Sequence, residues 1–320
     1  MLMPLKWIKK RLVLSIILGM ILGLMIGQLF DVDPLRSAVS VLSFLMVYPM
    51  MVTLDFNSLF QKGNIRLQLT TQLINFIVLP LMAYAFGLIF FSDAIYLRLA
   101  ILLIALLPTS GMTVSWTVMS KGNVKEAIRM IVIGLMLGGL LAPFYINFFL
   151  GESINLPFSQ IFNQIMIIVF IPMALGFITQ LVLKKRFGST TFNQSIKPVF
   201  PLFSTLFVVI LITIVMALRS EMLFNNPSMI PLILMPLILG YGIMIIGIHF
   251  IGVKLFSFED RVALMNGTMI RSLSPALAIA LTAFEGVGPE VALVIGLAYI
   301  VQVQLAAYYV KRNMKMAQQA

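Results

Sequence analysis

Cysteine is absent from this sequence of 320 residues, and charged residues are scarce. Without cysteine the chain has no disulfide, no thiolate metal ligand and no thiol nucleophile. Charged residues make up only 10% of the chain, whereas a soluble domain carries about 25%. So few charges cannot cover a surface that faces water. The composition therefore excludes an ordinary soluble protein.

Long apolar stretches take the place of the missing charges, and 61% of the residues are hydrophobic. Each stretch has about 20 residues, enough for one helix across a hydrocarbon core of about 30 Å. The ten stretches are 12–30, 36–54, 69–91, 97–120, 126–150, 160–183, 200–219, 229–254, 260–283 and 288–310. Because their connections are short, we expect an all-α integral membrane protein with a single transmembrane domain, 1–320, embedded in the lipid bilayer.

The basic residues lie in short clusters between the apolar stretches, which is typical of membrane topology rather than of nucleic-acid binding. With a cytoplasmic N-terminus and ten spans, 18 lysines and arginines fall on the cytoplasmic side. Only Arg36, Arg98 and Arg219 fall on the other side. This asymmetry predicts a multi-pass protein of the cell (inner) membrane with both termini in the cytoplasm.

Ten spans with both ends on one side divide into two halves of five, and the second half then enters the membrane from the opposite side. This arrangement is an inverted repeat, which is common among secondary transporters. We expect repeat one at about 1–151 and repeat two at about 152–320. The fourth span of each half, 97–120 and 260–283, carries proline and small polar residues near its middle.

These interruptions predict two broken helices that cross at the membrane midplane. Proline lacks a backbone donor and clashes with the carbonyl four residues earlier, so a helix bends or breaks there. We expect Pro108 with Gly111, and Ser274 with Pro275, each to end one half-helix and start another, with Ser274 as the N-cap. Two such breaks at equivalent positions indicate a binding site. The alternative is that these prolines only kink their helices.

Arg271 is the only charged residue in the middle of a predicted span, because every aspartate and glutamate falls near a boundary or in a loop. An arginine at the centre of a membrane helix costs about 3 kcal/mol on insertion scales. One interpretation is that Arg271 binds the carbonyl groups freed at the breaks and ties them together. The other, which we favour, is that it faces an aqueous cavity and attracts an anion together with the half-helix N-termini.

The predicted substrate-binding residues come from the two breaks and from two mid-span asparagines. They are Arg271, Thr109, Ser110, Ser272, Ser274, Asn75 and Asn266. The middle of the membrane offers no carboxylate, histidine or cysteine, the groups that acid–base or nucleophilic chemistry needs. We therefore expect no catalytic residue, no metal and no cofactor.

Three stretches carry a resemblance to a known superfamily. Residues 45–54, LMVYPMMVTL, resemble the second helix of arsenite permeases of the arsenical-resistance type. Residues 112–123, MTVSWTVMSKGN, resemble their fourth helix and the loop after it, and residues 275–280, PALAIA, resemble the end of their crossing segment. The same layout recurs in the bile acid:sodium symporter family. The resemblance implies a ten-helix transporter with inverted repeats, closer to the arsenite permeases.

The sequence departs from both patterns at functional positions. The permeases carry a cysteine where this chain has Thr109, and a glutamate where it has Ala276. The glutamate and glutamine of the sodium symporters' crossing segment fall near Met269 and Leu273. The resemblance therefore does not imply that this chain captures trivalent arsenic with a thiolate. It also does not imply that side chains at these positions coordinate sodium.

Together these features predict a secondary active transporter of a small anion or oxyanion that resembles arsenite efflux permeases. The alternative is a sodium-coupled organic anion symporter of the bile acid type, and an intramembrane enzyme is the least favoured function. A coupling ion, proton or sodium, is compatible with either transporter.

Overall fold

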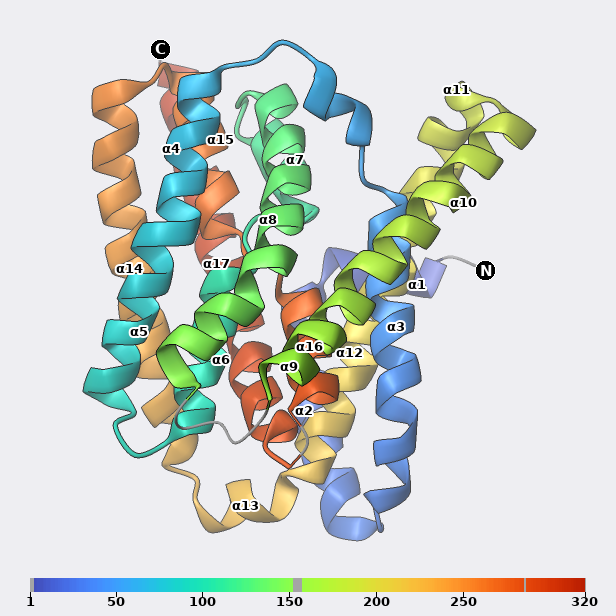
Figure 1. The fold of residues 1–320 in the computed structure, drawn as a ribbon, viewed down its shortest axis with the longest axis vertical. Helices are drawn as coiled ribbons and strands as arrows, with labels where there is room; N and C mark the ends of the chain where they lie inside the picture. The colour runs from blue at the N-terminus through green and yellow to red at the C-terminus, as the bar shows by residue number, and fades with distance from the viewer. Residues whose placement is uncertain (1–2, 152–156, 285, 320) are drawn as a thin grey trace. The chain divides into compact units, whose positions relative to one another are not determined.

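A computed structural model describes residues 3–151, 157–284 and 286–319. Within these residues all regular structure is helical (Figure 1). The α-helices are α1 (Met3–Lys10), α2 (Leu12–Leu29), α3 (Arg36–Val52), α4 (Ile65–Leu73), α5 (Leu79–Phe90), α6 (Ile95–Leu106), α7 (Met112–Met119), α8 (Val124–Leu150), α9 (Phe158–Ile165), α10 (Ile171–Phe187), α11 (Ser189–Thr191), α12 (Phe200–Leu218), α13 (Ser220–Asn225), α14 (Met229–Leu255), α15 (Phe258–Met269), α16 (Leu273–Ala283) and α17 (Gly288–Gln319). Glu152 and Glu285, two of the eleven carboxylates, lie outside the described residues.

Eight helical stretches of the described residues are long and apolar enough to cross a membrane. They are Leu12–Leu29, Asp33–Val52, Ile65–Phe90, Val124–Leu150, Phe158–Phe187, Ser189–Leu218, Met229–Leu255 and Gly288–Asn313. Each overlaps one of the apolar stretches predicted from the sequence. The other two predicted stretches are the interrupted ones, which form α6 with α7 and α15 with α16.

Three of the long stretches contain a wide π-helical turn. The turns are η3 (Ile74–Val78), η4 (Met166–Phe170) and η5 (Phe192–Ile196). Two residues after the end of each turn comes a proline, Pro80, Pro172 or Pro198 respectively. A proline cannot donate to the carbonyl four residues earlier and clashes with it, so the helix widens there. Pro80 has no N–H to donate to the carbonyl of Phe76, four residues earlier. This carbonyl, in η3, accepts a hydrogen bond from the Tyr145 hydroxyl instead.

The described residues form two compact units, each assembled from separate parts of the chain. Unit 1 takes them from 3–54, 157–232 and 274–296, and unit 2 from 55–151, 233–273 and 297–319. Three short 3-10 turns complete the helical structure: η1 (Asp33–Leu35) and η6 (Lys197–Val199) in unit 1, and η2 (Phe56–Phe60) in unit 2.

Unit 1 packs α2 directly against α12 through glycine. A Cβ atom on Gly27 would lie 2.1 Å from the carbonyl oxygen of Ala217, so any side chain there would force the two backbones apart. Small residues at such contacts are how membrane helices approach closely. The end of α3 is bound by Gln180 of α10, whose Nε2 donates to the carbonyls of Val52 at 2.9 Å and Leu54 at 2.8 Å.

In unit 2 a buried polar network joins the starts of α4 and α8. Glu126 accepts hydrogen bonds from the backbone N–H of Asn64 at 2.9 Å and from Gln68 Nε2 at 2.6 Å. It also forms an ion pair with Arg129, whose Nη1 lies 3.4 Å away. Arg129 in turn donates to the carbonyls of Ser58 and Gln61. A buried carboxylate is tolerated here because it is both paired and hydrogen-bonded.

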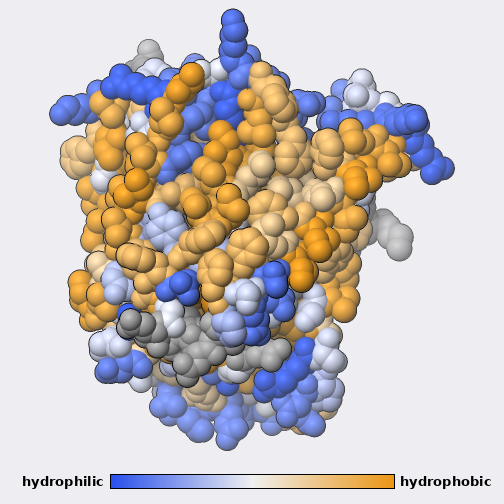
Figure 2. Space-filling view, in the orientation of Figure 1, coloured by the Kyte–Doolittle hydropathy of each residue, from blue (hydrophilic) through white to orange (hydrophobic). Residues whose placement is uncertain are grey.

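Much of the outward surface is apolar. Figure 2 shows hydrophobic residues covering most of the visible helix surface, while hydrophilic residues gather near helix ends. Leu22 on α2 remains 54% exposed and Ile89 on α5 72% exposed. Large aliphatic side chains left outside on many helices are typical of a protein whose solvent is lipid.

Candidate functional site

The two helix breaks lie in unit 2 and are joined by backbone hydrogen bonds. Residues 107–111 separate α6 from α7, and residues 270–272 separate α15 from α16. The N–H of Ser110 donates to the carbonyl of Ile270 at 2.8 Å, and the N–H of Ser272 donates to the carbonyl of Leu107 at 2.8 Å. Each break therefore satisfies backbone groups that the other leaves without a helical partner.

The first break follows the sequence prediction, and the second differs from it by a few residues. Pro108 lies inside the first break, and Gly111 directly precedes α7. In the second, α16 begins at Leu273, so Ser274 and Pro275 lie in its first turn and Ser274 is not the N-cap. The physical reason is that the first N–H groups of a helix have no intrahelical acceptor, so proline is tolerated at several positions there.

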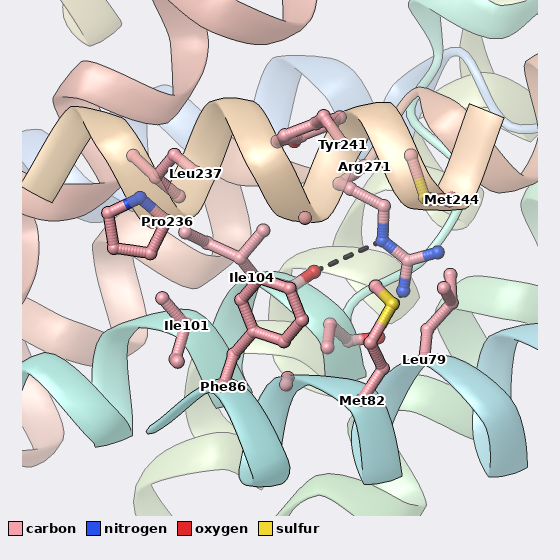
Figure 3. A pocket seen from close by; sticks show the side chains of 13 residues that line it. Leu79, Met82, Phe86, Ile101, Ile104, Pro236, Leu237, Tyr241, Met244 and Arg271 are labelled. Carbon is pink, nitrogen blue, oxygen red and sulfur yellow. Dashed lines mark hydrogen bonds between the residues drawn. The ribbon is translucent and has the colours of Figure 1, made fainter. Parts of the chain in front are cut away.

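The side chain of Arg271 is buried at this crossing, with 2% of the residue exposed. Its Nε donates to the carbonyl of Ile104 at 3.1 Å, as Figure 3 shows, and its Nη2 donates to the carbonyl of Ala105. Its Nη1 donates to Asn75 Oδ1 at 2.5 Å and to the carbonyl of Thr268 at 3.1 Å. The guanidinium thus binds carbonyl oxygens near the C-terminal ends of α6 and α15.

The backbone of Arg271 is held just as firmly as its side chain. Gln302 of α17 accepts from the N–H of Arg271 at 2.7 Å and donates to its carbonyl at 3.1 Å. The hydroxyl of Tyr241 on α14 donates to the same Gln302 Oε1 at 2.9 Å. Gln302 and Tyr241 were not among the predicted site residues. A glutamine in the middle of a span was the available signal for Gln302, which sequence reasoning attributes to helix packing.

Other side chains bind the carbonyl groups at the end of α15. Thr109 Oγ1 donates to the carbonyl of Gly267 at 2.7 Å, and Asn75 Nδ2 donates to the same oxygen at 3.3 Å. Thr113 Oγ1 donates to the carbonyl of Asn266 at 3.4 Å. The last carbonyls of a helix need partners from outside it, and here they come from η3, the first break and α7.

Two buried polar atoms of predicted site residues have no hydrogen-bond partner within the described part of the chain. They are Ser272 Oγ and Asn266 Oδ1, and both residues are at most 1% exposed. The amide nitrogen of Asn266 donates to Thr117 Oγ1 at 3.2 Å. The Ser110 hydroxyl accepts from the N–H of Met112 at 3.3 Å. Because an unsatisfied buried polar atom costs about 1–3 kcal/mol, these two atoms mark places where a ligand or water gains a hydrogen bond.

Thr109 adopts a strained backbone conformation in the first break. Its φ angle is +50°, in the left-handed region that β-branched residues rarely occupy. Such a conformation costs about 1–3 kcal/mol and persists only where the surroundings impose it. The hydrogen bond from Thr109 to Gly267 is one such constraint.

Arg271 also lines a cavity in unit 2 whose volume is about 520 Å³, including the space open to the outside. Its remaining lining is apolar except for Tyr241: Leu79, Met82, Ala83, Phe86, Ile101, Ile104, Ala105, Pro236, Leu237, Gly240 and Met244. In Figure 3 the guanidinium lies near Leu79, Met82 and Met244, and Pro236, Leu237 and Ile101 line the other part of the cavity. The cavity thus combines a mostly hydrophobic wall with a single positive charge, as many ligand sites do.

The structure therefore brings together six of the seven predicted substrate-binding residues in unit 2. Arg271, Asn75 and Thr109 donate to carbonyls at the end of α15, Asn266 supplies one of the carbonyls there, and Ser110 and Ser272 connect the two breaks. Ser274 belongs to unit 1 and is buried in the first turn of α16. No group of histidines and carboxylates within the described ranges is arranged to hold a metal ion.

Comparison with known proteins gives three relatives. Over 214 residues the chain is 26% identical to the arsenical-resistance protein Acr3 of Alkaliphilus metalliredigens. This alignment covers 62% of this chain and 59% of that protein. Over 292 residues it is 22% identical to an uncharacterized transporter of Synechocystis sp., covering 83% and 76%. Over 225 residues it is 26% identical to sodium/bile acid cotransporter 7 of Danio rerio, covering 63% and 64%. The chain thus spans less than two thirds of the length of the first and third relatives.

The sequence profile of the Sodium Bile acid symporter family matches residues 40–226. This match includes the first break and the asparagine of η3 that binds Arg271. It agrees with the resemblance drawn from the three sequence stretches. Because the profile covers more than half of the chain, the protein belongs to the Sodium Bile acid symporter family, which is a family of transporters and not of enzymes.

Proposed function

We propose that this protein is a secondary active transporter of a small anion or oxyanion, with its substrate site at the crossing of the two breaks. The observation that carries the proposal is the pair of broken helices joined at Ser110 and Ser272, with a buried arginine beside them. Broken helices that meet inside the membrane form the substrate sites of many transporters. The site residues are Arg271, Thr109, Ser110, Ser272, Asn75 and Asn266, while Ser274, which belongs to unit 1, stays a prediction from the sequence.

The proposed architecture has ten spans in two inverted repeats of five. Counting α6 with α7 and α15 with α16 as single broken spans adds two to the eight unbroken ones. The broken spans are then the fourth of each half, as an inverted repeat requires. In this arrangement the crossing lies near the midplane of the membrane and both termini are cytoplasmic.

The anionic nature of the substrate follows from charge. Arg271 is the only charged residue that lines the cavity, and none of the ion pairs in the described part of the chain involves it. A fixed positive charge in a mostly apolar surrounding attracts an anion strongly because the local dielectric constant is low. Ser272 and Asn266 do not line this cavity, and their unpartnered oxygen atoms offer polar contacts to a molecule bound at the crossing itself.

The test begins with a ligand screen on purified protein. A compound that binds only the folded state raises the melting temperature, so arsenite, bile salts, keto acids and sodium are compared directly. The compound that stabilises the protein is then used for uptake into proteoliposomes. We expect Arg271→Ala to abolish uptake while expression in the membrane is retained. Uptake at the normal rate by this variant would contradict the anion role of Arg271.

A second candidate is a sodium-coupled symporter of organic anions. The mostly apolar lining of the cavity favours it, because the hydrophobic part of an amphipathic anion gains contacts there. The name of the Danio rerio relative points to the same class of substrate. Uptake that depends on a sodium gradient, and stops when choline replaces sodium, would favour this candidate over the first.

A further inference from the structure

The family takes its name from sodium, so we asked whether the crossing fits a sodium ion. In transporters with broken helices, carbonyl groups at half-helix C-termini and in unwound backbone coordinate the coupling sodium ion. At this crossing the corresponding groups are the carbonyls of Ile104 and Ala105 on α6 and of Thr268 on α15. All three accept a hydrogen bond from the guanidinium of Arg271. The groups suited to a cation are therefore already bound to one.

A fourth oxygen completes this arrangement, which we call the oxygen cage. It consists of the carbonyl oxygens of Ile104, Ala105 and Thr268 together with Asn75 Oδ1, which lies 2.5 Å from Arg271 Nη1. These oxygens come from α6, α15 and η3, so the guanidinium ties three elements of unit 2. All four ligands are neutral, and oxygen is the donor that hard monovalent cations prefer.

The positive charge of the guanidinium is complementary to the negative helix ends around it. The C-terminal end of a helix carries about half a negative elementary charge, and two such ends, those of α6 and α15, face Arg271. The two ends therefore stabilise a positive charge at this position. Gln302 fixes the point from which the side chain enters the cage, because it holds the backbone of Arg271 at both its N–H and its carbonyl.

We propose that Arg271 is a tethered cation that fills a position where other transporters of this architecture would hold a mobile monovalent cation. The crossing of this protein is then complete without sodium at this position. Removing the guanidinium converts the oxygen cage into a site for sodium or another small monovalent cation. The proposal concerns the ion and is independent of which substrate is transported.

The experiment compares the wild type with Arg271→Met, in which the side chain keeps its approximate length and loses its charge. Purified proteins are melted in choline chloride, sodium chloride and potassium chloride at equal ionic strength. We expect the melting temperature of the wild type to be the same in all these salts. We expect R271M to melt several degrees lower in choline and to recover most of that loss with sodium, in proportion to the logarithm of its concentration.

Three further variants distinguish cation binding in the oxygen cage from unspecific effects of salt on stability. Arg66→Met removes an exposed arginine of α4 outside the cage and should behave as the wild type. R271M combined with Asn75→Leu lacks one cage oxygen and should lose most of its response to cations. Arg271→Lys keeps a tethered charge and should melt at the same temperature in every salt. If R271M does not survive extraction in choline, its recovery when sodium is present during extraction supports the proposal.

A sodium-specific rise in the melting temperature of the wild type would overturn the proposal, and so would a folded R271M that responds to none of the cations. An R271M that is lost equally from sodium and choline extracts, while R271K shows a sodium-specific stabilisation, would also overturn it. No substrate is present in these measurements. A failure of the anion-transport proposal would therefore appear in the uptake assay and leave the melting temperatures unaffected.

Discussion

Gln302 illustrates at the scale of one residue how a single side chain supports the site. It pairs with both backbone groups of Arg271 and with the hydroxyl of Tyr241, and it is fully buried. Without it, two backbone groups and a phenol would lie in a low-dielectric surrounding without partners. Such groups are costly to leave unpaired.

We therefore predict that Gln302→Leu destabilises the protein by about 1–3 kcal/mol, since several buried groups lose their partner at once. Gln304 lies on the same helix and is exposed, so Gln304→Leu is the matched control and should change stability little. Thermal unfolding of both purified variants measures the difference. Equal melting temperatures for the two variants would show that Gln302 is not a support of Arg271.

Sequence reasoning found Arg271 because a charge in the middle of an apolar span is conspicuous. It gave two interpretations of that arginine. The hydrogen bonds to Ile104, Ala105 and Thr268 show that it does tie the carbonyls at the breaks, while its anion-binding role stays a prediction. Tyr241 was not found, because one tyrosine in the apolar stretch 229–254 has no local feature that marks its partner. The left-handed conformation of Thr109 was equally hidden, since nothing in a β-branched residue suggests it.

At the scale of elements, α8 supports the first break through glycine. Gly134 and Gly138 lie one turn apart and face Pro108. A Cβ atom on Gly138 would lie 2.8 Å from the carbonyl oxygen of Leu106 and 3.1 Å from Pro108 Cδ. The first of these neighbours is backbone, which cannot rotate away as a flexible side chain does.

Gly138→Ala should therefore shift the first break relative to α8, lower the melting temperature and reduce uptake. Overpacking of this kind typically costs about 1–3 kcal/mol. The control is Gly242→Ala on α14, where the added methyl group has no neighbour within 4 Å. Because alanine is the better helix former, the control should be neutral or slightly more stable. If both variants melt alike, α8 does not position the break through this contact.

The positions of the elements could be predicted closely because the apolar stretches are long and the connections short. The breaks themselves were predictable from proline and small polar residues. The exact start of α16 was not, because Pro275 is compatible with several positions of a first helical turn. The π-helical turns before Pro80, Pro172 and Pro198 were not predicted either, since proline alone does not distinguish a kink from a wider turn.

At the scale of the whole molecule, the distribution of lysine and arginine predicts the orientation of the chain. The absence of cysteine makes this prediction easy to test, because a single introduced cysteine is the only thiol in the protein. Ser92 lies in a loop predicted outside the cell, and Lys185 lies in the last turn of α10, on the side predicted inside. Both residues are exposed.

We expect a membrane-impermeant maleimide added to intact cells to label Ser92→Cys and not Lys185→Cys. After the membrane is opened, both variants should react. The wild type, which has no thiol, is the control for unspecific labelling. Labelling of K185C in intact cells, with S92C protected, would reverse the predicted orientation and place both termini outside.

The division into two units could not be read from the sequence. Each unit draws segments from both predicted repeats, for instance 3–54 and 157–232 in unit 1. Apolar periodicity describes each helix alone and carries no record of which distant helix it packs against. The repeats and the single domain from 1 to 320 stay predictions, as does the choice of substrate.

The two hydrogen bonds between the breaks have a mechanical consequence. Ser110 with Ile270 and Ser272 with Leu107 form a short ladder between chain segments about 160 residues apart. Sliding one segment past the other would break both hydrogen bonds and leave four peptide groups without partners, in a place where no water replaces them. The free-energy cost would be several kcal/mol. Any conformational change that opens the protein first to one side and then to the other must therefore move both segments together as one rigid body. The backbone bends outside these two segments.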